Sequence, residues 1–349
     1  MISRGWWMPS AIFIQHIDQP MKTRSLHHPE IPVSEIGLGC WQLGGADWGF
    51  VDDERAFSIL RQAIDSGITF FDTADVYGSG RSEELIGRFL RENDLLNKVF
   101  VATKLGRMGD LYPDKYTEEG VRLATENSLR RLGVETLDLT QLHCVPTEIL
   151  RQGEIFEWLR KLRSDGKIRR FGASVESDEE GLLCLRQKGL ASLQVIFNIF
   201  RQKPALELFK EALEKRVGII ARLPLASGVL SGKFTQDTHF EEKDHRNYNR
   251  DGAAFNVGET FAGIPYAKAV SLADALKPLV PEGFSMAAMA QRWILDHEAV
   301  TTVIPGASSV AQVTQNALVS ELSPLAPELH AKIHKFYEDS VAGQIRGPY

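Results

Sequence analysis

The stretch TFFDTADVYGSGRSEELIGRFLRENDLLNKVFVATK, residues 69–104, contains the pattern that decides the fold. It begins with a short apolar run, residues 69–72, and ends with a second run that is rich in apolar and β-branched residues, residues 99–104. Between them, residues 82–92 place apolar side chains at helical spacing and charged side chains on the other face. A strand, a helix and a second strand in this order predict parallel strands joined by a crossover helix.

The same alternation extends along the rest of the chain. Further strand-like runs occupy residues 34–41, 137–143, 168–174, 193–198, 217–223 and 300–305, and further helical patterns occupy residues 54–66, 118–132, 148–164 and 204–216. An open doubly wound sheet and a closed barrel both have this alternation. About eight strands in 349 residues suit the barrel, and no GxGxxG motif follows a strand, as an open dinucleotide-binding sheet would require. We therefore predict a single (β/α)8 TIM barrel over residues 21–349.

Two segments depart from the alternation. Residues 228–264 form a long loop after the seventh strand, rich in Gly, Asn and charged residues, and a loop of this length in a compact domain is usually functional. Residues 1–20 precede a further methionine, Met21, and their apolar run is too short for a signal peptide. We interpret residues 1–20 as a disordered or extraneous extension.

The composition argues against several classes of protein. A net charge of −6 argues against a nucleic-acid partner, because phosphate binding requires a basic face. The longest apolar runs fall far short of a membrane span. Cys40, Cys144 and Cys184 are widely separated, which predicts buried free thiols in a reducing, cytoplasmic compartment and no metal site. His239 and His245 stand in polar segments and are interpreted as surface residues. Nothing in the sequence indicates the oligomeric state.

Polar residues stand at the ends of the predicted strands. In a barrel of parallel strands, the carboxyl ends of the strands meet at one mouth. The residues at these positions are Asp72, Lys104, His143, Ser174, Gln194 and Arg222. Tyr77 follows Asp72 by five residues, on the loop. Because a buried charge costs free energy unless it is paired, we expect Asp72 and Lys104 to form an ion pair.

These residue types suit proton donation to a carbonyl oxygen. A tyrosine has a pKa near 10, and a nearby ammonium favours the phenolate and lowers that pKa. Asp72 would anchor Lys104, and His143 would orient the carbonyl. The pattern contains no activated nucleophile, so we expect the electron pair to come as hydride from a nicotinamide cofactor. Each residue alone also has a structural interpretation, as an ion pair, a packing tyrosine or a core histidine, but their combination favours catalysis.

Six segments together resemble the aldo-keto reductase superfamily, in the family's order and approximate spacing. Residues 71–78, FDTADVYG, match the signature FDTAxxYG, and the other segments are Thr103-Lys104, Leu142-His143, GKIR at 166–169, PLASG at 224–228 and IPGASS at 304–309. The resemblance runs from about Met21 to the C-terminus. It implies a catalytic tetrad of Asp72, Tyr77, Lys104 and His143, with Tyr77 as the general acid that reduces an aldehyde or ketone.

The resemblance also implies an extended cofactor site across the mouth. Ser174 and Gln194 match positions that hold the nicotinamide carboxamide, and Arg222 stands where the family often places an aromatic ring against the nicotinamide. The positions that match the loop over the pyrophosphate are Leu225, Ser227, Gly228, Leu230 and Lys233. The positions that match the adenosine end are Ser308, Gln312 and Asn316. Trp48, on the loop after the first strand, is interpreted as a wall of the substrate pocket, with simple packing as the alternative.

The sequence departs from the family pattern in two places. Val175 follows Ser174 where an Asn is common, so one carboxamide hydrogen bond is lost or comes from another group. Gly306 and Gln312 stand where many members have a Lys and an Arg that bind the 2′-phosphate. Because a phosphate needs charge-assisted donors, Lys233 and Arg246 are the candidates to replace them. NADPH is the expected cofactor, and NADH is the alternative.

Two other functions are compatible with the same residues. The first is a regulatory subunit that binds and senses the cofactor with slow turnover, although residues 1–20 are short for a docking extension. The second is an NAD-dependent alcohol or sugar dehydrogenase that runs the reaction in the opposite direction.

Overall fold

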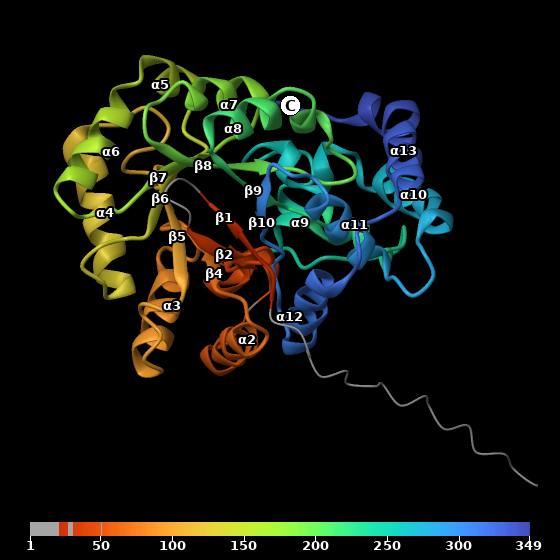
Figure 1. Cartoon of the computed structure of the whole chain (residues 1–349), viewed down its shortest axis with the longest axis horizontal. Coiled ribbons are helices and arrows are strands. Elements are labelled where there is room, and N and C mark those ends of the chain that lie inside the picture. The colour runs from red at the N-terminus through yellow and green to blue at the C-terminus, as the bar shows by residue number, and fades with distance from the viewer. Residues whose placement is uncertain (1–20, 27–30, 50) are drawn as a thin grey trace, which may run out of the picture.

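Eight parallel strands curl into one closed sheet in the computed structural model, which describes residues 21–26, 31–49 and 51–349 (Figure 1). In chain order the strands are β3 (Leu38–Gly39), β4 (Phe70–Asp72), β5 (Phe100–Leu105), β6 (Leu139–His143), β7 (Phe171–Ser174), β8 (Leu190–Ile196), β9 (Gly218–Arg222) and β10 (Val300–Val303). Each strand pairs with the next. Parallel bridges Ile36↔Val303 and Gly39↔Gly306 join the first strand to the last. The predicted barrel is confirmed.

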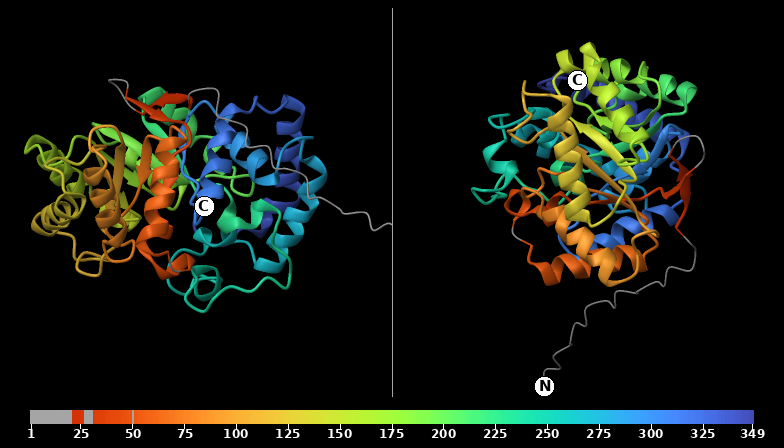
Figure 2. Two further views of the ribbon diagram at one scale, coloured as in Figure 1. Left: turned by 90° about the horizontal axis from the view of Figure 1, so that it is seen from below. Right: turned by 90° about the vertical axis from the view of Figure 1, so that its left-hand side faces the viewer.

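The helices lie around the outside of the sheet (Figure 2). They are α2 (Asp53–Asp65), α3 (Arg81–Glu92), α4 (Glu118–Leu132), α5 (Thr147–Gln152), α6 (Glu154–Ser164), α7 (Asp178–Leu185), α8 (Leu208–Lys215), α10 (Tyr266–Leu276), α11 (Met286–Leu295), α12 (Val310–Ala317) and α13 (Pro327–Phe336). Local sequence sets their ends. The Thr117 side chain accepts a hydrogen bond from the N–H of Gly120 at the start of α4, and Gly133, at φ 69°, ends it. None of the helices in the described ranges has the length and apolar content to cross a membrane.

One predicted helix is in fact two. The pattern of residues 148–164 predicted a continuous helix, but α5 ends and α6 begins at Gly153. Gly153 has φ 82°, a left-handed conformation that glycine adopts without the steric cost that a Cβ imposes. The chain therefore turns at this residue. The predicted first strand, residues 34–41, is also shorter than expected, because β3 covers only Leu38–Gly39.

The amino-terminal end of the barrel is closed. A hairpin of β1 (Thr23–Ser25) and β2 (Pro32–Ser34) lies there, and Arg24 Nη1 donates to the carbonyl of Val300 at the start of β10, at 2.8 Å. A buried apolar cluster joins the hairpin to the strands; it comprises Leu26, Val33, Phe70, Ala102, Leu139, Ala191, Ile220 and Ile304. Because this end is packed, a ligand must enter at the carboxyl ends of the strands.

The long loop predicted after the seventh strand follows β9. It contains only short helical turns, η3 (Ala226–Ser231), α9 (His245–Tyr248), η4 (Val257–Glu259) and η5 (Phe261–Gly263). The Ser227 hydroxyl ties two parts of it together, because it donates to the carbonyl of Glu259 at 3.0 Å and accepts from the N–H of Phe261 at 3.2 Å. Arg346, near the C-terminus, donates from Nε to the carbonyl of Gly263 at 2.9 Å. These contacts fix residues 257–263 over the mouth of the barrel. The predicted extension, residues 1–20, lies outside the described residues.

Candidate active site

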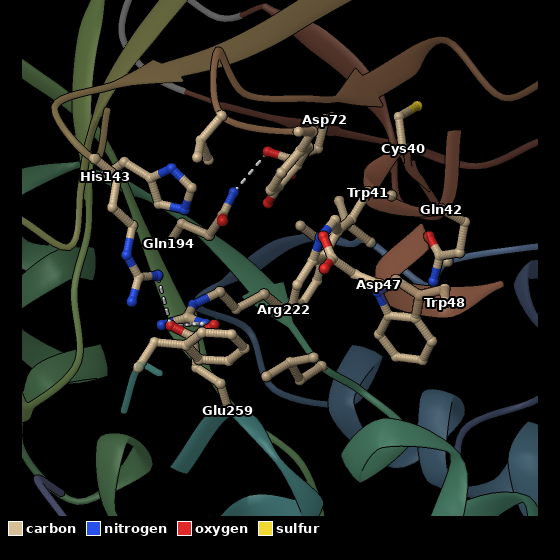
Figure 3. A pocket seen from close by; sticks show the side chains of 18 of the residues that line it. Cys40, Trp41, Gln42, Asp47, Trp48, Asp72, His143, Gln194, Arg222 and Glu259 are labelled. Atoms are coloured by element: carbon tan, nitrogen blue, oxygen red, sulfur yellow. Dashed lines mark hydrogen bonds and ion pairs between the residues drawn. The ribbon is translucent and has the colours of Figure 1, made fainter. Parts of the chain in front are cut away.

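A cavity of about 280 Å³ opens at the carboxyl ends of the strands (Figure 3). The strand ends contribute Asp72, His143, Gln194 and Arg222 to its lining, as the sequence predicted. The other lining residues are Gly39, Cys40, Trp41, Gln42, Asp47, Trp48, Val76, Tyr77, Arg107, Leu223, Pro224, Tyr248, Phe255, Glu259, Ile304 and Gly306. Lys104 and Ser174 lie buried at the ends of their strands. The strand-end polar residues that the sequence predicted to meet therefore lie together at one mouth.

Lys104 forms the expected ion pair with Asp72. Its Nζ lies 2.6 Å from Asp72 Oδ1, and it also donates to the carbonyl of Thr73 at 2.9 Å. The third contact of the ammonium is with the hydroxyl of Tyr77, at 3.1 Å. An ammonium has three N–H donors, so the geometry uses all of them. The Lys104 side chain is fully buried, which makes these contacts strong relative to those of a surface pair.

Burial governs the protonation of Tyr77. Burial raises the pKa of Tyr77 above its ordinary value, while the charge of Lys104 acts in the opposite direction. We expected the effect of Lys104 to dominate, and burial outweighs it because the ring is enclosed. Tyr77 is therefore a neutral phenol near neutral pH, and it can donate its proton. The sequence could not show this, because it does not report how deeply the hydroxyl is buried.

His143 is a neutral imidazole beside Tyr77. Burial lowers its pKa well below the usual value, and the charges of Lys104, Arg107 and Arg222 lower it further. The two rings meet edge to face, with centroids 5.8 Å apart and an interplanar angle of 88°. A neutral imidazole keeps one donor and one acceptor nitrogen. It can orient a polar oxygen without adding a charge.

The loop that carries Tyr77 packs tightly against α1 (Trp41–Gly44). The indole of Trp41 stacks on the Tyr77 ring at 5.7 Å and 14°. A Cβ on Gly44 would lie 2.6 Å from the carbonyl carbon of Tyr77, and Gly78 has φ 61°. Glycine is required at both positions, because any side chain would push the two backbones apart. The close contact between the two backbones therefore fixes the position of the Tyr77 side chain in the cavity.

Gln194 hydrogen-bonds to Asp72, a member of the predicted tetrad. Its Nε2 donates to Asp72 Oδ2 at 2.7 Å (Figure 3). Its Oε1 accepts from Ser174 Oγ at 3.3 Å. Both residues were expected to hold a carboxamide, and the structure places them side by side at the mouth. At Val175, where the family commonly has an Asn, the backbone carbonyl accepts a hydrogen bond from Arg222 Nη2 at 3.2 Å.

Arg222 belongs to a buried cluster of charges. Glu259, from the long loop, places Oε1 3.0 Å from Arg107 Nη1 and 3.5 Å from Arg222 Nη1. Although burial alone would raise the Glu259 pKa, the charges of Arg107 and Arg222 lower it below the usual value. Glu176 Oε1 lies 3.7 Å from Arg107 Nη2. Burial and then the charge of Glu259 raise the pKa of Glu176 to about 7.

The same cluster contains possible metal ligands. Cys144, Glu176 and Glu259 place ligand atoms within 4.8 Å of one another. Glu259 is already neutralised by two guanidinium groups, and burial raises the pKa of the Cys144 thiol to about 12. A metal ion needs deprotonated ligands, so the cluster suits an ion-pair network.

Aromatic side chains form the opposite wall of the cavity. Trp48 lines the cavity and meets Trp41 edge to face at 5.5 Å, and the His245 ring packs 4.2 Å from the Trp48 ring. The interpretation of His245 as a surface residue is wrong: it is fully buried, because the long loop folds back over α1. Asp47 accepts hydrogen bonds from Trp41 Nε1 at 3.1 Å and from the Tyr248 hydroxyl at 2.8 Å.

The residues predicted for the rest of the cofactor lie along the loops that follow β9 and β10. Ser227 and Leu230 are buried, Gly228 has φ 99°, and Leu225 packs against the core. Gly306 lines the cavity. Ser308 donates its N–H to Gln312 Oε1 at 2.7 Å, and Asn316 accepts from Gln291 at 3.1 Å.

The two predicted phosphate-binding cations differ in their surroundings. Lys233 is exposed. Arg246 already donates from Nε and Nη2 to Asp244, at 2.9 and 2.5 Å, and its guanidinium lies over the rings of Phe240 and Trp48. Lys233 is therefore the better placed of the two to bind a new anion.

Four buried polar atoms on the cavity lining have no hydrogen-bond partner within the described part of the chain. They are Gln42 Oε1, Trp48 Nε1, His143 Nδ1 and Arg222 Nε. Most buried polar atoms in proteins are hydrogen-bonded, so a group of exceptions in one cavity indicates a polar ligand. The lining therefore fits a group with both apolar rings and polar edges.

Three charged residues that line the cavity, Arg107, Glu259 and Asp47, were not predicted from the sequence. Arg107 follows Lys104 by three residues, on the loop directly after β5, so its position just past a strand end was a usable signal. Glu259 had no such signal, because it lies in a long loop without periodicity. Tyr248 and Phe255 lie on the same long loop and were missed for the same reason. Trp41, in α1, and Asp47, in the helical turn Ala46–Trp48, were missed because the fold of the segment after β3 brings them to the cavity.

Comparison with known proteins gives consistent matches over most of the chain. The model of the family described as Aldo/keto reductase family matches residues 35–338. The aldo-keto reductase YhdN of Bacillus subtilis is 31% identical over 296 residues, which cover 84% of this chain and 87% of that protein. A solved glycerol dehydrogenase from Gluconobacter oxydans has a TM-score of 0.76 and 31% identity, covering 94% of this chain and 98% of its own. An aldo-keto reductase from Klebsiella pneumoniae, solved in complex with NADPH, has a TM-score of 0.66 and 26% identity, covering 91% and 96%.

Proposed function

The chain belongs to the aldo/keto reductase family, and from that premise we propose that it reduces an aldehyde or ketone with NADPH, using Tyr77 as the general acid. The observation that carries the proposal is the position of the Lys104 ammonium, which contacts both Asp72 and the Tyr77 hydroxyl beside a neutral His143. The Tyr77 hydroxyl is thus a proton donor, and the adjacent Lys104 ammonium stabilises the phenolate that forms when the proton leaves.

The residues of the chain act on the carbonyl oxygen. Tyr77 and His143 hydrogen-bond that oxygen and hold the carbonyl carbon toward the cofactor. As negative charge develops on the oxygen, the Tyr77 proton moves to it, and Lys104 stabilises the phenolate that remains. Asp72 keeps Lys104 charged and in place, since burial alone would lower the pKa of Lys104 while Asp72 and Tyr77 raise it above its usual value.

NADPH would supply the hydride when bound, as nicotinamide cofactors do. Ser174, Gln194 and Arg222 would hold its nicotinamide end, and the unpartnered Arg222 Nε at the cavity supports this assignment. The remaining proposed contacts are Leu225, Ser227, Gly228, Leu230, Lys233, Arg246, Gly306, Ser308, Gln312 and Asn316. The NADPH complex of the Klebsiella pneumoniae relative supports NADPH over NADH.

Oxidation of an alcohol is the second candidate direction. The neighbour from Gluconobacter oxydans is a glycerol dehydrogenase, and the same groups catalyse both directions, with the Tyr77 phenolate as the base. A cofactor-sensing subunit with slow turnover is the third candidate. Trp41 and Trp48 line the cavity, so quenching of tryptophan fluorescence by NADPH measures binding independently of turnover. We expect binding together with reduction of 4-nitrobenzaldehyde; binding without turnover of any carbonyl or alcohol would favour the sensor.

Removing the charge of Lys233 is expected to weaken NADPH binding selectively. A charge-assisted hydrogen bond contributes about 1.5–3 kcal/mol, so Lys233→Gln should raise the Kd for NADPH by roughly tenfold or more. The Kd for NADH, which has no 2′-phosphate, should change little. Lys210→Gln, on the outer helix α8, removes the same charge and serves as the control. Equal weakening of NADPH and NADH in Lys233→Gln would contradict the assignment of Lys233 to the phosphate.

Enlarging Gly44 is expected to displace Tyr77. In Gly44→Ala the new Cβ would lie 2.6 Å from the Tyr77 backbone, so the loop must move. A shift of about 1 Å at a catalytic group can cost about 10²-fold in rate, and overpacking costs about 1–3 kcal/mol of stability. We expect a large fall in kcat and only a modest fall in the melting temperature. Gly109→Ala is the control, because a Cβ there meets nothing within 4 Å. A Gly44→Ala variant with unchanged kcat would show that the contact does not position Tyr77.

A further inference from the structure

Arg107 is a cation of the cavity that the mechanism above does not use. It lies two residues beyond the end of β5 (Phe100–Leu105), and its side chain is only 15% exposed. Its guanidinium packs over the Phe255 ring at 5.5 Å and lines the cavity with His143. Its charge contributes to the low pKa of His143, so it lies close to where the carbonyl oxygen would bind.

Most of the donors of Arg107 are unused. Within the described chain its one hydrogen bond runs from Nη1 to Glu259 Oε1, at 3.0 Å. Nη2 lies 3.7 Å from Glu176 Oε1, which is too far for a hydrogen bond. A guanidinium has five N–H donors arranged as a planar fork. The side chain is therefore held in place by Glu259 and still has donors for a second anion.

The charges around Arg107 leave this end of the cavity short of negative charge. Arg107 and Arg222 share one fully ionised carboxylate, that of Glu259. The second carboxylate, Glu176, is protonated more readily than an ordinary glutamate, because burial and the charge of Glu259 raise its pKa to about 7. Two other titratable groups packed here, His143 and the Cys144 thiol, are neutral. The third, Glu180, faces Glu176 from the other side, where its carboxylate accepts hydrogen bonds from the N–H of Glu176 at 2.8 Å and from the Thr147 hydroxyl at 2.7 Å.

The other charges on the lining lie elsewhere or are already paired. Asp72 and Lys104 neutralise each other. Asp47 accepts hydrogen bonds from Trp41 and Tyr248 at the aromatic wall. An anion that binds at Arg107 therefore meets surplus positive charge, and it favours the protonated form of Glu176.

We propose that Arg107 is a specificity residue that binds a carboxylate group of the carbonyl substrate. The proposal rests on the proposed function, since it places the substrate carbonyl at Tyr77 and His143. A carboxylate matches the planar fork of a guanidinium with two parallel hydrogen bonds. The chain would thus prefer keto acids and aldehydes that carry a carboxylate over neutral carbonyl compounds of the same shape.

A matched pair of substrates tests this preference. 4-Carboxybenzaldehyde and 4-nitrobenzaldehyde have nearly the same shape and differ in charge, so the ratio of their kcat/KM values reports recognition of the carboxylate. In Arg107→Gln this ratio is expected to fall by about 10- to 100-fold relative to the unmodified protein. A general loss of activity lowers kcat/KM for both substrates by the same factor, so it leaves the ratio unchanged. Arg107→Lys keeps the charge but loses the fork, so its ratio should fall less; it also carries the test if Arg107→Gln does not fold.

The pH profile of the ratio provides a second readout. In the unmodified protein the ratio should fall as the pH rises through about 7, because ionised Glu176 competes for Arg107. In Glu176→Gln this fall should disappear. If Arg107→Gln lowers kcat/KM for both aldehydes equally, Arg107 is a structural residue and the inference fails while the proposed function stands. If neither aldehyde is reduced by the unmodified protein, both proposals fail together.

Discussion

Replacing Tyr77 with phenylalanine is expected to lower kcat for aldehyde reduction by about 10²- to 10⁴-fold, which is the range that general acids contribute. The phenylalanine ring keeps the stacking on Trp41 and the edge contact with His143. It removes only the hydroxyl that Lys104 contacts at 3.1 Å. Binding of NADPH, measured by quenching of tryptophan fluorescence, should therefore persist while turnover is lost.

The control for this variant is Tyr112→Phe, which removes a hydroxyl from a side chain that is 39% exposed and lies outside the cavity lining. It should keep the original kcat. A Tyr77→Phe variant that reduces 4-nitrobenzaldehyde at the original rate would mean that another group donates the proton. Loss of cofactor binding in Tyr77→Phe would instead show that the ring supports the site structurally.

Replacing Lys104 with methionine is expected to destabilise the barrel as well as abolish turnover. The change leaves the Asp72 carboxylate buried with Gln194 as its remaining side-chain partner. Removing one member of a buried ion pair costs about 3–5 kcal/mol, because the other charge is left uncompensated. Urea unfolding should therefore show a clear drop in the free energy of unfolding for Lys104→Met.

The double variant Asp72→Asn with Lys104→Met separates the two effects. It removes both charges, so it should recover much of the lost stability. It should not recover turnover, because Tyr77 still lacks the cation that stabilises its phenolate. Lys98→Met, at an exposed position, is the control for removal of a surface charge. Equal stability of Lys104→Met and the unmodified protein would contradict the buried ion pair.

The sequence predicted the parts of the site that depend on strand order alone. Parallel strands align their carboxyl ends, so Asp72, Lys104, His143 and Gln194 had to meet once the barrel was inferred. The position of Tyr77 followed because its loop is short and begins at a strand end. The break between α5 and α6 was also readable, since Gly153 is a common helix-ending residue, yet the charged and apolar periodicity on both sides obscured it.

The other features of the site depend on long-range folding, which the local sequence pattern does not encode. Glu259 reaches Arg107 and Arg222 only because the long loop returns across the mouth, held by Ser227 and Arg346. The burial of His245 has the same origin. The protonation of Tyr77 depends on how completely the surrounding loops exclude water. The sequence does not predict the extent of this exclusion.

The most direct test of the central claim follows the hydride itself. The protein is incubated with 4-nitrobenzaldehyde and with NADPH in which deuterium replaces both hydrogens at C4 of the nicotinamide, and the alcohol product is analysed by mass spectrometry. Hydride transfer at this site predicts 4-nitrobenzyl alcohol with one deuterium on the carbinol carbon, formed at a rate that falls steeply in Tyr77→Phe. Alcohol without deuterium, or no alcohol although NADPH binds, would contradict the account.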